Sequence, residues 1–183
     1  MKNLFLIILL CCSVHAVAQI SDADMEVLRS KWKLELSDRA DEKLEKWVKN
    51  EMLSPVGDSL ARIFFKDTMV LDQLLKKQVK KDPSNLGISK ANMACMSAYD
   101  ALVDQYYATL LAKMKVDDKT LIENTQSNWR KYMETERELC GKLMQKEYSG
   151  TGGTAHAILY TERLKNISRN RCVELANYLI NMQ

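Results

Sequence analysis

Hydrophobic residues recur along most of this chain at intervals of three and four positions, the spacing that gives a helix one apolar face. Strongly alternating β-branched runs, which strands favour, are missing. Three long stretches carry the helical pattern in the C-terminal part: 89–114, 120–148 and 154–182. Their connections are short, so successive helices should lie antiparallel. The sequence therefore predicts an all-α fold with an antiparallel bundle of three long C-terminal helices.

The N-terminal part predicts an additional helical segment. Its first helix ends before Pro55, because proline keeps the preceding residue out of the helical region. Asp67 is predicted to cap a further helix over residues 68–80. The Asp-Pro-Ser-Asn-Leu-Gly stretch that follows is the clearest loop in the chain. We place a boundary in this loop, between an N-terminal helical segment (19–82) and a C-terminal helical domain (83–183).

Residues 1–18 have the composition of a signal peptide. Residues 4–12 form a short apolar run, and residues 16–18 read Ala-Val-Ala before Gln19. The run is too short to span a membrane as a helix. Cys11 follows leucine rather than the small residue that lipid attachment requires, so cleavage after the Ala-Val-Ala site is favoured, with a lipoprotein as the alternative. We expect a periplasmic or secreted protein.

The mature chain of about 165 residues suits one compact domain. The signal peptide contains Lys2 and no acidic residue, so 26 basic residues stand against 24 acidic ones. This near balance indicates neither nucleic acid nor an anionic membrane as a partner.

Enzymatic chemistry has little support. His156 is the one histidine left after the signal peptide, and no cysteine or carboxylate stands at metal-ligand spacing from it. The glycine-rich stretch 150–154 follows a helix and lacks the Gly-Lys-Ser/Thr ending of a P-loop. Glu134 and Glu138, four residues apart, are typical of a solvated helix face. We predict a protein without catalytic residues, metal or cofactor, and an unrecognised hydrolase is the remaining enzymatic alternative.

The mature chain has three cysteines, an odd number for an oxidising compartment. Counted from the turn near residues 116–117, Cys95 and Cys140 lie about 22 and 23 residues along successive helices, which places them at the same level. Cys172 lies about 12 Å from Cys140 along the bundle axis. We predict a disulfide between Cys95 and Cys140, with Cys172 as a buried free thiol.

An ordered set of polar, aromatic and glycine positions runs through the C-terminal helices. It comprises Met93 shortly before Cys95, Asp100, Tyr107, Gln126-x-x-Trp129, Tyr132, Glu136, the glycine turn, and Arg171-x-x-x-Leu175. Behind a secretory signal, this arrangement resembles the LprI-like lysozyme-inhibitor family of bacterial envelope proteins. The resemblance covers about half of the chain, from Met69 to Leu179.

The sequence also departs from the family pattern. Met133 stands where the family usually has arginine, and Asp104 where it usually has asparagine. Many members have cysteines at the positions of Arg137 and Arg163. The loss of both cysteines together implies a scaffold without that crosslink.

Most of the motif residues have a structural interpretation. Trp129 lies on one apolar stripe with Ile122, Met133 and Cys140, which favours core packing over ligand contact. A further set is predicted to form a buried polar network that fixes helix register, since unpaired buried groups are costly: Asp100, Gln126, Glu136 and Arg171. If these side chains are exposed, they are ordinary solvated groups.

The resemblance implies an exported, non-enzymatic binding protein whose partner is a peptidoglycan-cleaving lysozyme. Such an inhibitor has to fill a cleft that contains two catalytic carboxylates. The most exposed candidate for that contact is the glycine turn, formed by Gly150, Thr151, Gly152, Gly153 and Thr154. The alternative is a helical interaction module that binds another envelope protein, with Trp32 and Trp47 as anchors.

Overall fold

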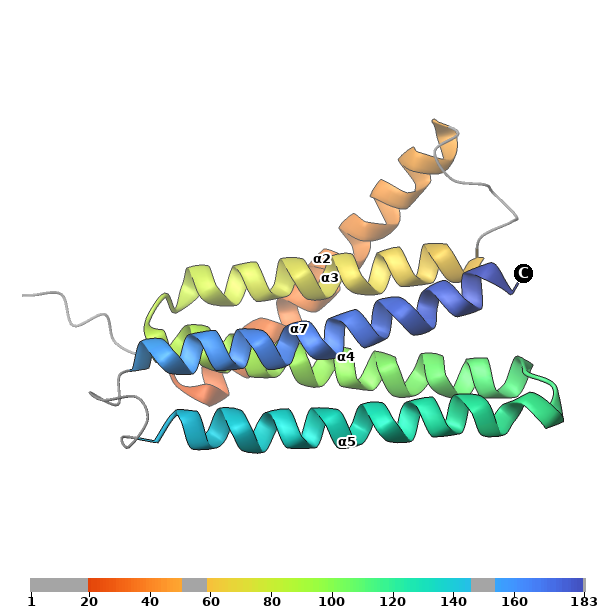
Figure 1. Ribbon diagram of the computed structural model, residues 1–183. Coiled ribbons are helices and arrows are strands. Elements are labelled where there is room, and N and C mark those ends of the chain that lie inside the picture. The colour runs from red at the N-terminus through yellow and green to blue at the C-terminus, as the bar shows by residue number, and fades with distance from the viewer. Residues whose placement is uncertain (1–19, 51–58, 146–153, 183) are drawn as a thin grey trace, which may run out of the picture.

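The computed structural model describes residues 20–50, 59–145 and 154–182 (Figure 1). Within these ranges the chain is helical and has no strand, which confirms the all-α prediction. The elements are α2 (Asp22–Lys49), α3 (Ser59–Lys81), α4 (Asn85–Lys113), the 3-10 helix η1 (Val116–Asp118), α5 (Lys119–Leu143) and α7 (Thr154–Asn181). The predicted signal peptide and residues 150–153 of the glycine turn lie outside the described residues.

The corner between α3 and α4 shows how local sequence sets a helix boundary. Ser84 is the N-cap of α4, and its hydroxyl accepts a hydrogen bond from the Gly87 amide at 3.0 Å. The buried Asp82 carboxylate in turn accepts hydrogen bonds from the amide (3.1 Å) and hydroxyl (2.6 Å) of Ser84. Gly87 lies so close to Asp82 that a Cβ atom there would overlap the carboxyl group. This corner therefore depends on three short-range hydrogen bonds and on the absence of a side chain at Gly87.

The long helices lie side by side, and α2 crosses them obliquely (Figure 1). The most extensive contact is between α4 and α7, whereas α5 approaches both more sparsely. The N-terminal helix α2 packs mainly on α3, and α3 packs on both α4 and α7. Helix α3 of the N-terminal segment therefore packs directly on the C-terminal helices, whereas α2 is joined to them mainly through α3.

The core consists of three groups of buried side chains. The largest joins α4, α5 and α7, and partly buried α3 residues pack on it: Cys95, Tyr99, Val103, Tyr106, Leu110, Ile122, Cys172, Leu175, Ala176 and Leu179. A second joins α5 to α4 and α7 through Met96, Met133, Cys140 and Leu164. The third joins α2 to α3 through Leu36, Ala40 and Val70. Each of α2, α3, α4, α5 and α7 buries part of its apolar face in this way.

The predicted helix start at Asp67 is wrong, because α3 continues through this position without a break. The Asp67 carboxylate instead accepts a hydrogen bond from the Tyr106 hydroxyl of α4 at 3.2 Å. The neighbouring Thr68 hydroxyl donates to the Phe64 carbonyl oxygen one turn back. Both polar side chains find partners inside an uninterrupted helix, so neither is needed as a cap.

Candidate functional site

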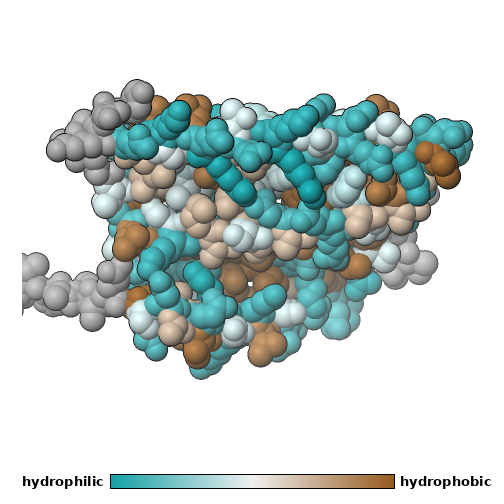
Figure 2. Space-filling model, turned by 90° about the horizontal axis from the view of Figure 1, so that it is seen from below, coloured by the Kyte–Doolittle hydropathy of each residue, from teal (hydrophilic) through white to brown (hydrophobic). Residues whose placement is uncertain are grey.

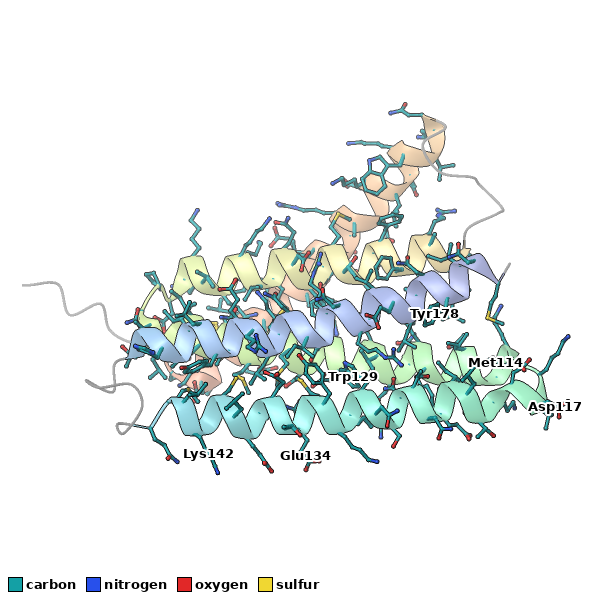
Figure 3. All side chains as sticks on the ribbon, in the orientation of Figure 1. Met114, Asp117, Trp129, Glu134, Lys142 and Tyr178 are labelled. Carbon is teal, nitrogen blue, oxygen red and sulfur yellow. The ribbon has the colours of Figure 1, made fainter. Side chains whose placement is uncertain are left out.

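A charged groove lies between α4 and α5. Two ion pairs bridge the helices there, from Arg130 to Asp104 and from Arg137 to Asp100, each at 2.9 Å. Trp129 lines the groove beside these charges, and the open volume is about 340 Å³. In Figure 3 Trp129 lies between α5 and the helices that it packs against. Asp100 therefore joins α4 to α5, as a register-fixing residue would.

A buried polar contact joins α5 to α7. The Arg171 guanidinium is 6% exposed and donates from Nε (3.0 Å) and Nη2 (2.9 Å) to Oε1 of Gln126, which is 2% exposed. Its Nη1 donates to the half-exposed Glu174 at 3.1 Å. The Gln126 Nε2 atom is buried without a hydrogen-bond partner. Two motif residues thus contact each other directly, and their side chains are not available to a protein partner.

Glu136 forms the second bridge between α5 and α7. Arg163 Nε lies 2.7 Å from the Glu136 carboxylate, and this hydrogen bond holds the pKa of the carboxyl below its usual range. The polar motif residues therefore form three separate contacts between pairs of helices rather than one continuous network.

Of the remaining motif residues, Met93 (39%) and Tyr132 (47%) are exposed, and four others pack in the interior. Trp129 is partly buried against both the largest and the second core group, and Tyr107 is partly buried against the largest. Cys95 and Leu175 are buried in the largest group. These four positions contribute packing, so a contact surface has to come from other residues.

Thr154 is the only residue of the predicted contact turn that the structure describes. It is exposed at the first position of α7. Its hydroxyl accepts a hydrogen bond from Asn85 Nδ2 at 2.9 Å, which joins the starts of α7 and α4. Gly150, Thr151, Gly152 and Gly153 lie outside the described residues.

A family model for the lysozyme inhibitor LprI matches residues 69–175, more than half of the chain. The chain belongs to the LprI family. No curated protein and no solved structure matches the chain. The matched segment runs from α3 into α7 and contains all of the motif residues described above; it stops before the distal end of α7.

Arg137 and Arg163, which the sequence analysis gave as departures from the family pattern, belong to two of these bridges. Arg137 joins α5 to α4 through Asp100, and Arg163 joins α7 to α5 through Glu136. Both arginine side chains are about half exposed. Ion pairs therefore connect the helices at both positions.

The predicted disulfide between Cys95 and Cys140 is wrong, because Cys95, Cys140 and Cys172 are all free and buried. Cys95 belongs to the largest core group, whereas Cys140 packs with Met96, the next residue of α4. Residues one apart on a helix point about 100° apart around its axis. The register count gave the height of Cys95 along the bundle but not the direction of its side chain.

We expect these thiols to be unreactive in the folded protein. Burial raises the pKa of Cys95 to about 11 and that of Cys172 to about 12, and it also raises the pKa of Cys140. At pH 8 the reactive thiolate is therefore scarce, and the buried sulfur atoms are shielded as well. A maleimide reagent should label none of the three in the folded mature chain and all three after unfolding in urea without reductant. If only one cysteine were labelled in urea, the other two would be joined in the predicted disulfide.

Two tyrosines of α4 connect helices although the sequence did not predict that role for them. Tyr99 donates a hydrogen bond to Asp72 at 2.8 Å, and Tyr106 donates to Asp67, so both connect α4 to α3. Burial raises the pKa of both phenols well above the usual range. The two tyrosines are seven residues apart, which is about two helical turns, so the sequence already indicated that they lie on the same face of one helix.

Neither predicted tryptophan anchor stands free on the surface. Trp32 is partly buried against the α2–α3 core group, with Lys77 Nζ 5.8 Å from its ring centroid. Trp47 meets Phe65 edge to face, with 5.9 Å between centroids. Each ring therefore already contacts side chains of its own chain.

The described residues contain no group of three His, Cys, Asp or Glu side chains that could hold a metal ion. His156 is partly buried, and its ring lies 6.3 Å from that of Tyr160. None of the helices within residues 20–50, 59–145 and 154–182 combines the length and the hydrophobicity needed to cross a bilayer.

Proposed function

We propose that this chain is an exported, non-enzymatic protein that binds and inhibits a peptidoglycan-cleaving lysozyme. The observation that carries the proposal is the match of the LprI lysozyme-inhibitor family over residues 69–175. Export rests on the predicted signal peptide, with the mature protein starting near Gln19. The periplasm or the medium is the proposed location.

The geometry supports a division between scaffold and contact surface. Asp100, Gln126, Glu136 and Arg171 are bound to other side chains of the same chain. Their proposed role is to hold α4, α5 and α7 together as an antiparallel bundle that forms the C-terminal domain (83–183). The proposed contact is at the end of this bundle where α7 begins, in the turn from Gly150 to Thr154. The exposed Thr154 and its hydrogen bond to Asn85 support this end as a defined surface.

Inhibition is tested by mixing the mature chain with lysozymes of several structural classes and following lysis of bacterial cells. We expect the lysis rate of at least one class to fall with inhibitor concentration, because a bound inhibitor keeps the glycan from the two catalytic carboxylates. No protection against any class at large molar excess would rule the function out.

The contact surface is tested separately with two matched variants. Thr154→Arg and Thr135→Arg both place a long side chain at an exposed helical threonine, on α7 and α5 respectively. Thr154→Arg should raise the half-inhibitory concentration by about tenfold or more, whereas Thr135→Arg should leave it unchanged. Equal inhibition by both variants would show that lysozyme does not contact the start of α7.

A further inference from the structure

An apolar groove opens at the end of the molecule where α4 ends, α5 begins and α7 ends. Its volume is about 420 Å³. Its floor consists of the buried Leu110 and Ile122, and its rim includes Leu121, Tyr178 and Met182. Figure 3 shows Met114 and Tyr178 at this end, with Asp117 at the tip of the adjoining turn. The groove is distant from Thr154, because the whole length of α7 separates them.

The rim residues expose much of their apolar side chains to solvent. Leu121 is 70% exposed, and Tyr178 and Met182 are each 49% exposed. Val116, in the adjacent η1 turn, is 80% exposed. Figure 2 shows brown residues at the right-hand end, where this turn lies, and separate brown spots elsewhere on the same face. An apolar groove bordered by exposed large apolar side chains is typical of a site that another molecule covers.

The turn and the helix ends beside the groove carry equal numbers of positive and negative side chains. Three lysines and three acidic residues lie in the turn and at the adjoining helix ends: Lys113, Lys115, Lys119, Asp117, Asp118 and Glu123. In the described part of the chain, the side chains of these six residues form no ion pair and no hydrogen bond. The charges of the α4–α5 groove, by contrast, pair across the helices.

We propose that a second copy of this chain covers the groove, so that two molecules associate end to end about a two-fold axis. A two-fold contact uses the same patch on both molecules, which must therefore be self-complementary. Equal numbers of unpaired lysines and acids around an apolar centre meet that requirement. A partner with one dominant charge would oppose half of these six residues, and like charges in contact suppress such partners.

The size of the groove sets the strength of this association. A stable interface buries about 800 Å² on each partner, and a single groove with four exposed apolar residues offers less. We therefore expect a weak dimer that forms with rising concentration. End-to-end pairing places the two Thr154 ends at opposite extremes of the dimer, about 40 Å along α7 from each contact. The dimer would thus present two lysozyme-contact ends, although dimerisation itself does not depend on the proposed function.

Sedimentation velocity of the mature chain, from about 10 μM to about 1 mM, tests the proposal. The average mass should rise toward that of a dimer across this range. Leu121→Asp should weaken association by about tenfold or more, because it places a charge on the apolar rim of the groove. Leu159→Asp is the matched control: it changes another exposed leucine (63%) near the opposite end of α7, and it should leave association unchanged. Circular dichroism should show the same helix content in both variants.

Charge reversal tests the self-complementarity directly. An acidic variant (Lys115→Glu with Lys119→Glu) and a basic variant (Asp117→Lys with Asp118→Lys) should each be monomeric, because like charges then meet across the axis. A one-to-one mixture should recover the dimer. A monomer throughout the range, a dimer that survives Leu121→Asp, or a mixture that stays monomeric would each overturn the proposal. Loss of lysozyme inhibition in Leu121→Asp without any dimer in the unmodified chain would assign the groove to lysozyme instead.

Discussion

Replacing Arg171 with alanine is expected to lower the free energy of unfolding by about 2–4 kcal/mol. The guanidinium is almost fully buried and supplies both hydrogen bonds that Gln126 Oε1 receives. Without it, both polar atoms of the Gln126 side chain would lack partners, since Nε2 has none already. The missing side chain would also leave a cavity between α5 and α7. Urea denaturation followed by circular dichroism measures the loss.

Glu174→Ala is the matched control for Arg171→Ala. Glu174 binds the same guanidinium, but its side chain is 54% exposed, so its removal should cost at most about 1 kcal/mol. Gln126→Ala, alone and combined with Arg171→Ala, completes a double-mutant cycle. Additive losses in that cycle would show that the two side chains are not coupled and would contradict a structural role for their contact.

Two glycine-to-alanine substitutions are expected to change stability in opposite directions. A Cβ atom at Gly87 would overlap the Asp82 carboxyl group and crowd its backbone oxygen, so Gly87→Ala should destabilise by about 1–3 kcal/mol. Asp82 cannot move away cheaply, because it is buried and holds Ser84. Gly141 lies inside α5 with nothing within 4 Å of its Cβ position. Gly141→Ala should stabilise by about 0.5–1 kcal/mol, because alanine loses less backbone entropy in a helix.

Thermal unfolding of the two single variants and the unmodified chain checks this pair. The midpoint should fall for Gly87→Ala and rise for Gly141→Ala. An unchanged midpoint for Gly87→Ala would mean that the α3–α4 corner relaxes without cost, and the close packing of Asp82 against Gly87 would then have no energetic weight.

Helical periodicity predicted the elements of this fold well because it is a local property. The stretch 89–114 corresponds to α4, which starts four residues earlier, and the predicted start at Thr154 coincides with that of α7. The N-cap at Ser84 lies within the predicted loop, where serine competes well for the free amides of a helix start. Local sequence thus contained most of the information on the C-terminal helices.

The errors arose where a distant residue decides the outcome. Asp67 has the chemistry of a helix cap, but the hydroxyl of Tyr106, 39 residues later, gives it a partner inside a continuous helix. Cys95 and Cys140 were placed at one height by counting, but the direction of a side chain depends on which helices surround it. Neither the partner of Asp67 nor the helices that surround the cysteines can be identified from the neighbouring sequence.

The candidate site was predictable in its residues but not in its connections. Gln126 and Arg171 were expected in one polar network, and they form a direct buried contact. The groove beside Trp129 and the apolar groove beside Leu121 were not predicted, since a groove is defined by the spacing between helices. Side chains from three helices form the apolar groove, and each helix alone shows ordinary amphipathic spacing.

The sparse approach of α5 to its neighbours has a consequence for how the molecule opens. Large side chains, partly exposed ion pairs and the buried Gln126–Arg171 contact hold α5 in place, whereas α4 and α7 pack along their lengths. Amide protons of α5 should therefore exchange with solvent through partial detachment of that helix, before those of α4 and α7 are released by global unfolding. Added salt screens exposed ion pairs and should speed exchange in α5 selectively. The protein thus has a less stable outer helix on a more stable inner pair.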